Sequence, residues 1–349
     1  MNRRHVLQSA AVAAASSALP QVHAATSSKV MVGMDHFAVR GAGMKAPALI
    51  DYAASIKVDI LFISELWPLE SQDEDYLKKL KAQADAAGIK LYTGGMSICK
   101  TSNTWKAEQG NPEEYLAGLI RIAKTCGSPV ARCVLGNAKD RTTDGGIEKH
   151  IEECVKVLQA VKTRCETEGV KIAIENHAGD MQSQELRELI EAAGKGHVGA
   201  NIDPGNAVWA LEDPMHNLEV LGPVTICSSV RDSMIWETDE GAMVQWTAVG
   251  EGLVDFNAYA KRYAELAPGA PLNIETISGF AKPFPFLKDE FWKPYAKAPA
   301  ASFAGWLAVM KRGKKIDPFK APNKEAEAVY QKGELERSVK VLRSATAAL

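Results

Sequence analysis

Three carboxylates, those of Glu175, Asp203 and Glu275, each follow a short apolar run of the sequence directly. A carboxylate at the end of a buried strand is costly unless it is paired or bound to a cation, and three that converge also repel one another. Each acid alone is as well explained by capping a helix or by pairing with an arginine. Because the pattern repeats three times in register, one divalent metal is the prediction, with Mn²⁺ or Mg²⁺ favoured by oxygen ligands and Co²⁺ or Zn²⁺ as further candidates.

Eight apolar runs hold these residues in place. The runs are rich in β-branched residues, mostly continuous rather than alternating, and bounded by Gly, Pro, Asp or Asn, which is typical of parallel strands buried on both faces. They cover residues 30–34, 58–63, 90–94, 129–135, 170–174, 198–202, 224–227 and 271–274.

Longer segments with an apolar period near 3.6 lie between the runs and are predicted to be helices. They cover residues 45–56, 72–87, 111–126, 146–168, 182–193, 213–220 and 255–267. Strand and helix units that alternate along the chain predict a (β/α)8 TIM barrel, whose active site lies at the carboxyl ends of the strands. A doubly wound sheet is disfavoured, because its G-x-G-x-x-G turn is missing after the first run.

The regular alternation stops after Glu275. Residues 278–300 are rich in proline and aromatic residues, and two further helices are predicted at 300–312 and 323–347. We therefore expect a barrel over residues 28–280 and a C-terminal loop-and-helix extension, residues 281–349, that packs on the barrel.

The first residues are typical of a targeting segment. Arg3 and Arg4 precede an alanine-rich apolar stretch, and a small-residue cleavage site ends at Ala24. Residues 1–25 are therefore predicted to be a signal peptide of the twin-arginine type, with an ordinary Sec signal as the alternative. The mature chain is expected to be periplasmic or otherwise exported.

Composition excludes several classes of protein. The chain has 349 residues with a formal net charge of −2, so no basic excess points to a nucleic-acid partner. No apolar run after the leader is long enough to span a membrane. The six cysteines form no C-x-x-C pair and are expected to be buried thiols. A homo-oligomer is compatible with the sequence.

Four motifs in sequence order carry a resemblance to a known family. Residues 175–180 read E-N-H-A-G-D, 201–206 read N-I-D-P-G-N, 250–256 read G-E-G-L-V-D-F and 273–275 read N-I-E. Over residues 30–280 the chain resembles the sugar phosphate isomerase/epimerase superfamily with the xylose-isomerase-like barrel, and its tail is similar to that of an exported subgroup.

The resemblance implies one divalent metal held by Glu, Asp, His and Glu from the last four strands. Glu175, Asp203 and Glu275 match three of these positions. The family segment H-x-K-D reads S-V-R-D here, so Ser229 stands where the histidine is expected. Serine is a poor ligand. The fourth ligand is therefore open between Ser229, Asp232, a different residue and a water, and loss of the metal is also open.

Other residues near the strand ends are candidates for binding the substrate. They are His177, Arg231, His36, Glu65 and Asn206. His177 lies two residues after Glu175, so both side chains share a face if the strand geometry continues that far. An arginine at position 231 suits either a substrate oxygen or a neighbouring carboxylate.

The chemistry that the resemblance implies is proton transfer at a carbon next to a carbonyl group of a sugar. Glu175 and Glu275 are the predicted acid and base. Export favours a free keto-sugar over a sugar phosphate, which makes a lyase or hydratase acting on 3-keto-glycosides the first alternative. A non-catalytic sugar-binding barrel is the second. The related barrel endonuclease IV is disfavoured, because the chain has only seven histidines and a slightly acidic charge.

Overall fold

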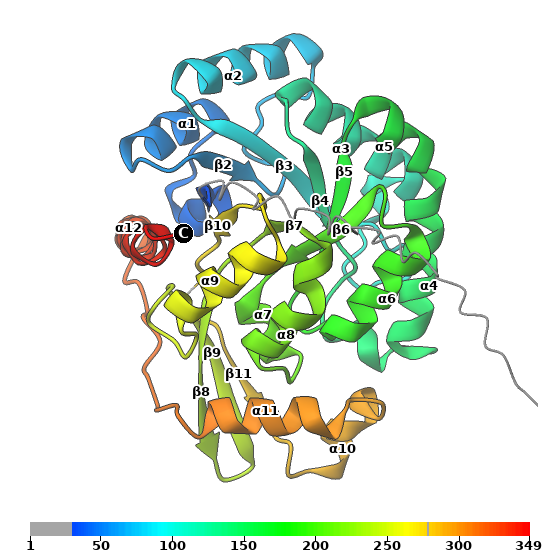
Figure 1. Ribbon diagram of the computed structural model, residues 1–349, viewed down its shortest axis with the longest axis vertical. Coiled ribbons are helices and arrows are strands. Elements are labelled where there is room, and N and C mark those ends of the chain that lie inside the picture. The colour runs from blue at the N-terminus through cyan, green and yellow to red at the C-terminus, as the bar shows by residue number, and fades with distance from the viewer. Residues whose placement is uncertain (1–29, 278) are drawn as a thin grey trace, which may run out of the picture.

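The computed structural model describes residues 30–277 and 279–349, so the predicted signal peptide lies outside the described residues. Eight parallel strands form one sheet in the order β10-β1-β2-β3-β4-β5-β6-β7 (Figure 1). An isolated parallel bridge between Val230 and Ile274 joins the two edges, which closes the barrel. The strands are β1 Val32–Asp35, β2 Ile60–Ile63, β3 Lys90–Ser97, β4 Val130–Val134, β5 Lys171–Glu175, β6 Val198–Ile202, β7 Thr225–Ser228 and β10 Leu272–Ile274. The prediction of a (β/α)8 TIM barrel is confirmed.

Helices surround this barrel. They are α1 Ala46–Ser55, α2 Glu74–Ala86, α3 Pro112–Cys126, α4 Gly146–Ala160, α5 Lys162–Glu168, α6 Ser183–Ala193, α7 Pro204–Trp209, α8 Pro214–Leu221, α9 Phe256–Leu266 and α12 Lys324–Thr346. The predicted helix over 146–168 is divided at Val161 into α4 and α5. Helix α12 packs against α9 and the 3-10 helix η1, His36–Ala42, and is seen end-on beside α1 in Figure 1. It covers the barrel wall between β10 and β1.

A second, antiparallel sheet lies beside the barrel and was not expected from the sequence. Its strands are β8 Asp232–Thr238, β9 Gly241–Thr247 and β11 Ala281–Phe284, in the order β11-β9-β8. In Figure 1 it lies beside one end of α11 Ala300–Met310, and the short helix α10 Asp289–Trp292 lies at the other end of α11. The sheet and α11 enclose an apolar cluster in which Trp306 of α11 is completely buried. Trp306 Nε1 donates to the Val208 carbonyl at 2.8 Å. The β8–β9 hairpin thereby extends the wall around the strand ends.

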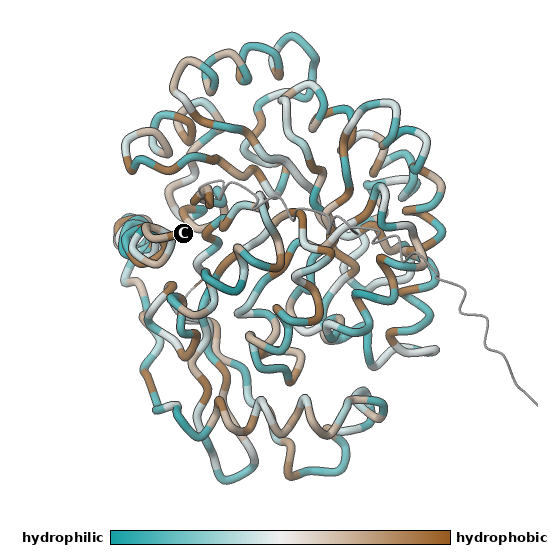
Figure 2. Tube along the Cα trace, in the orientation of Figure 1, coloured by the Kyte–Doolittle hydropathy of each residue, from teal (hydrophilic) through white to brown (hydrophobic). Residues whose placement is uncertain are grey.

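The main apolar core lies between the strands and the outer helices. Figure 2 shows hydrophobic residues along the strands and hydrophilic residues on much of the outer helical surface. The six cysteines all fall within the described residues and are free and buried, as expected. Among the described helices, none combines the length and apolar character needed to span a membrane.

Candidate active site

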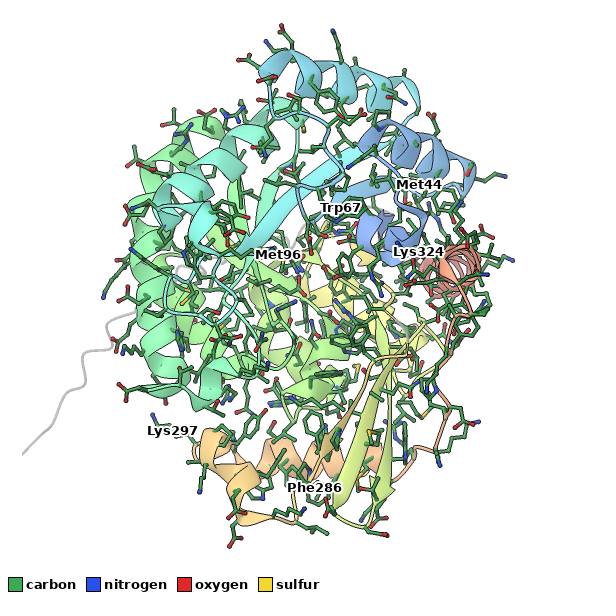
Figure 3. All side chains as sticks on the ribbon, turned by 180° about the vertical axis from the view of Figure 1, so that it is seen from behind. Met44, Trp67, Met96, Phe286, Lys297 and Lys324 are labelled. Carbon is green, nitrogen blue, oxygen red and sulfur yellow. The ribbon has the colours of Figure 1, made fainter. Side chains whose placement is uncertain are left out.

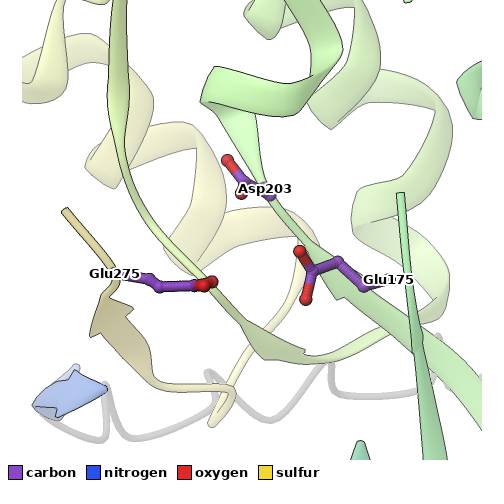
Figure 4. Close-up of side chains that lie close together, drawn as sticks. All are labelled: Glu175, Asp203 and Glu275. Carbon is purple, nitrogen blue, oxygen red and sulfur yellow. The ribbon is translucent and has the colours of Figure 1, made fainter. Parts of the chain in front are cut away.

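Glu175, Asp203 and Glu275 meet at the carboxyl ends of the barrel strands. Glu175 ends β5, Asp203 follows β6, and Glu275 follows β10. Their carboxylate oxygens lie within 4.8 Å of one another, close enough to share one metal ion, and all three side chains are buried. Figure 4 shows the Glu175 and Glu275 carboxylates directed toward each other beneath Asp203. We call these three residues the acidic triad.

Two buried arginines already pair with the triad. Arg231 Nε lies 2.7 Å from Asp203 Oδ2, and its Nη2 donates to Glu275 Oε2 at 2.7 Å. Arg132 Nε donates to Glu175 Oε2 at 2.7 Å, and its Nη2 lies 2.6 Å from the same oxygen. Three carboxylates and two guanidinium groups leave one formal negative charge.

Electrostatics at this cluster follow from burial and from the ion pairs. Burial alone lowers the pKa of Arg132, but the nearby Glu175 and Glu275 carboxylates outweigh it and raise that pKa above the ordinary value. Burial raises the pKa of Asp203, which Arg231 opposes and the other two triad carboxylates reinforce. A cluster with one excess negative charge thus favours uptake of one proton.

Arg132 was not among the residues selected from the sequence. It lies in the middle of β4, where every residue is buried. An arginine inside an otherwise apolar run of a parallel strand needs a buried partner of opposite charge, because an unpaired charge there is costly. That mismatch at position 132 was the signal that could have identified it.

A cavity of about 270 Å³ opens above the triad. Of the predicted residues, Glu65, His177, Arg231 and Glu275 line it. Further lining residues are Phe37, Arg40, Ser64, Met96, Arg132, Asn137, Ala178, Trp246, Ile277 and Phe280. Met96 is labelled near the middle of the molecule in Figure 3. The wall thus combines proton-carrying groups, cations and aromatic faces.

Two candidate substrate contacts lie away from the cavity wall. His36 is completely buried, with Nδ1 3.1 Å from Asp35 Oδ1 and 3.3 Å from the Ser64 amide that donates to it. Asn206 Nδ2 donates to Asp203 Oδ2 at 2.7 Å and to Glu175 Oε1 at 3.2 Å. In this geometry Asn206 holds two carboxylates of the triad together.

His177 and Glu65 both line the cavity, and the pKa of each is shifted from its ordinary value. Burial lowers the pKa of His177, so the imidazole is neutral at pH 7. Its Nδ1 donates to the Gly136 carbonyl at 2.6 Å, which leaves the other ring nitrogen as an acceptor. Burial also raises the pKa of Glu65, opposed by the charge of Arg132.

Neither candidate for the fourth metal ligand joins the triad in the described structure. Ser229 Oγ accepts a hydrogen bond from Asn201 Nδ2 at 3.0 Å. The Asp232 carboxylate accepts from backbone amides, among them those of Gly252 at 3.0 Å and Val254 at 3.1 Å. Burial raises its pKa to about 6 against these hydrogen bonds. Asp232 therefore anchors the loop of the third motif instead of facing the triad.

A closed eight-stranded barrel with an acidic cluster at its strand ends defines an enzyme-like class of TIM barrel. The sequence profile of the xylose isomerase-like TIM barrel matches residues 49–289, and the chain belongs to this family. A 3-oxo-isoapionate decarboxylase from Pectobacterium atrosepticum is 20% identical over 213 residues, which are 60% of this chain and 70% of that protein.

Solved structures share the fold at low sequence identity. A xylose isomerase domain protein from Planctomyces limnophilus superposes with a TM-score of 0.61 at 16% identity, over 92% of this chain and 100% of that one. A D-psicose 3-epimerase from Clostridium cellulolyticum H10 gives a TM-score of 0.57 at 14% identity, over 89% of this chain and 99% of that one. These likenesses establish the barrel, and the reaction must be argued from the site.

Proposed function

We propose that this protein is a sugar isomerase or epimerase that moves a proton at a carbon next to the carbonyl group of a keto-sugar. The observation that best supports this activity is the presence of Glu275 and Glu65 on the wall of one cavity, together with three arginines and aromatic side chains. Carboxylates transfer protons in such reactions, and arginines favour the oxygen that becomes negative.

Glu275 suits the role of base. It lines the cavity, and its side chain is 7% exposed and paired with Arg231. Glu65 suits the acid, because burial raises its pKa and keeps more of it protonated. Glu175 does not line the cavity and is paired with Arg132, so we assign it to positioning and not to proton transfer.

The proposed step moves one proton and one electron pair. The Glu275 carboxylate takes the proton from the carbon next to the carbonyl, and the C–H electrons form the carbon–carbon double bond of an enediolate while the carbonyl oxygen becomes negative. Arg132 and Arg231 line the cavity and favour that charge. Glu65 then returns a proton. Delivery to the opposite face of the same carbon restores the carbonyl group and gives the epimer. Delivery to the former carbonyl carbon gives the isomer, with the proton of the neighbouring hydroxyl group passing to the negative oxygen.

The proposed step does not involve the Mn²⁺ or Mg²⁺ that the resemblance implies. The triad is close enough to share an ion, but Arg231 already pairs with Asp203 and Glu275, and Ser229 replaces the histidine. The residues present therefore do not fit a metal in the arrangement that the structure has. We also propose that residues 1–25 direct export of the protein, which favours a free keto-sugar over a sugar phosphate as the substrate.

Hydrogen exchange tests the proposed activity. The purified protein is incubated in D₂O with free keto-hexoses, keto-pentoses and 3-keto-glycosides, and NMR follows deuterium at the carbon next to the carbonyl. We expect deuterium incorporation together with a new isomer or epimer. Loss of a substituent or of water indicates the lyase or hydratase. The similarity to a 3-oxo-isoapionate decarboxylase also favours this alternative. Binding without exchange indicates a sugar-binding barrel.

Glu65→Gln is expected to lower kcat by about 10²-fold, because an amide cannot return the proton. Burial raises the pKa of Glu65 above 4.5. An acid that must be protonated makes the wild-type rate fall as the pH rises through that pKa, and the variant should lose this limb of the pH–rate profile. Glu70→Gln, an exposed glutamate of the same loop, is the control and should keep the wild-type profile. An unchanged profile in Glu65→Gln contradicts the role.

A further inference from the structure

The guanidinium group of Arg231 occupies the centre of the acidic triad. Its Nε lies 2.7 Å from Asp203 Oδ2, and its Nη2 lies 2.7 Å from Glu275 Oε2 and 3.9 Å from Glu175 Oε1. One cationic side chain therefore reaches all three carboxylates. A divalent ion shared by these carboxylates would require the same space and the same oxygens.

The backbone around Arg231 is fixed by the closure of the barrel. Val230 N donates to the Asn273 carbonyl at 2.6 Å, and Glu275 N donates to the Val230 carbonyl at 2.9 Å. These bonds hold the backbone next to Arg231 in register with the backbone of Asn273 and Glu275. The arginine thus enters the triad from a segment that is hydrogen bonded to the barrel wall.

Space for the Arg231 side chain is built into the neighbouring elements. A Cβ at Gly205 would lie 2.2 Å from Arg231 Cγ, so only glycine leaves room for the arginine stem there. The guanidinium carbon lies 4.7 Å from the centre of the Trp246 ring, at a distance typical of a cation–π contact. Arg231 is 1% exposed. Gly205 of α7 therefore leaves room for the arginine stem, and Trp246 of β9 packs against its guanidinium group.

The oxygens of Asp203 and Glu175 that a metal would need are already engaged. Asp203 Oδ1 accepts from the Gly205 and Asn206 amides at 2.8 and 3.1 Å, and its Oδ2 accepts from Asn206 Nδ2 at 2.7 Å. Glu175 Oε2 accepts from Asn201 Nδ2 at 2.9 Å besides the two contacts from Arg132. Arg231 directly follows Ser229 and Val230 in the sequence. The position where the family's histidine is replaced by serine and the residue that supplies the cation therefore lie on the same stretch of chain.

We infer that Arg231 replaces the divalent cation of this site, so that the protein neutralises the acidic triad with its own side chain and binds no metal there. The charges support this directly, because the triad and the two arginines leave only one formal negative charge. A divalent ion added to the same cluster gives a net positive charge in a buried site, which is costly. The metal content of the site can be measured independently of the reaction that the protein catalyses.

Metal binding by the purified full-length protein tests the inference without any assay of activity. Elemental analysis should find no stoichiometric Mn, Mg, Co or Zn. Excess Mn²⁺ or EDTA should leave the melting temperature unchanged, and calorimetric titration with Mn²⁺ should detect no binding that depends on Asp203. About one equivalent of metal in the wild type, lost in Asp203→Asn, overturns the inference.

Removing the guanidinium should create the metal site that it prevents. Arg231→Met is expected to bind Mn²⁺ at least about tenfold more tightly than the wild type, a change of about 1.4 kcal/mol. The double variant Ser229→His, Arg231→Met restores the histidine and should bind still more tightly. Arg141→Met is the matched control, because it removes another buried arginine, paired with Glu185 at 2.7 Å outside the triad, and should gain no affinity.

The outcomes separate cleanly. A folded Arg231→Met variant that gains no Mn²⁺ affinity contradicts the idea that the guanidinium takes the ion's place. If Arg231→Met does not fold, the wild-type titration and its Asp203→Asn comparison still decide. A metal-free wild type that nevertheless catalyses exchange supports both the inference and the proposed activity, whereas a metal-free protein without exchange leaves the inference intact and counts against the activity.

Discussion

The Glu275→Gln variant is expected to lose about 10³- to 10⁴-fold in kcat on the substrate that the exchange experiment identifies. Glutamine keeps the shape of the side chain and an oxygen that can accept from Arg231 Nη2, now 2.7 Å from Glu275 Oε2. It cannot take up the proton from carbon. Since the contacts with bound sugar are retained, KM should change little while kcat falls, which is the pattern of a group that acts in the transition state.

Steady-state kinetics and deuterium incorporation check this result together. Exchange into recovered substrate should fall in parallel with turnover, because both need the same proton abstraction. Glu212→Gln is the matched control, since Glu212 is another buried glutamate, hydrogen bonded to Ser183 and Asn217 away from the cavity. It should keep the turnover of the folded protein. A Glu275→Gln variant with wild-type exchange excludes Glu275 as the base.

The barrel could be predicted because its signals are local. The run at 198–202 was predicted with the bounds that β6 has, and β5 was predicted within one residue at each end. Continuous apolar runs identify strands buried on both faces, and the amphipathic segments between them identify the covering helices. Their alternation along the chain then leaves few possible topologies.

The antiparallel sheet was missed for a physical reason. Residues 232–247 were not recognised as a hairpin, because the barrel pattern leads one to expect a helix directly after β7. The local signal was present, since Asp239, Glu240 and Gly241 separate two segments rich in β-branched and aromatic residues. Its third strand, β11, pairs with β9 from a distant part of the sequence, and no local pattern predicts such a partner.

The acidic triad could also be predicted, but its partners could not. Strand ends fix where the backbone of Glu175, Asp203 and Glu275 lies, so their convergence follows from the topology. Which cation neutralises them depends on the direction of the side chains of Arg132 and Arg231, and on the space that Gly205 leaves. From the sequence, pairing with an arginine was an alternative for each acid alone, whereas the structure shows arginine pairing for the whole cluster.

The stability of the protein should depend strongly on Arg132. Replacing it by methionine is expected to lower the free energy of unfolding by about 3–5 kcal/mol at neutral pH, the usual cost of removing one partner of a buried ion pair. Arg132 is 2% exposed, and its loss removes both contacts with Glu175 Oε2 and the hydrogen bond from Nη1 to the Gly95 carbonyl at 3.1 Å. The formal charge of the cluster then changes from −1 to −2, with three carboxylates and only Arg231.

Urea unfolding at several pH values measures the deficit in the free energy of unfolding and shows whether it depends on the charge of the cluster. Burial raises the pKa of Asp203 above its ordinary value, so the folded state takes up a proton there more readily than the unfolded chain. Loss of the Arg132 charge raises that pKa further in the variant than in the wild type, so protonation stabilises the folded variant more. The deficit of Arg132→Met should therefore shrink as the pH falls and grow as the pH rises. Arg262→Met removes an exposed arginine that pairs with Glu219 at 2.6 Å, and it should cost little stability, with little pH dependence. A deficit in Arg132→Met as small as that of the control, or one that is independent of pH, would mean that the acidic triad does not need its second arginine.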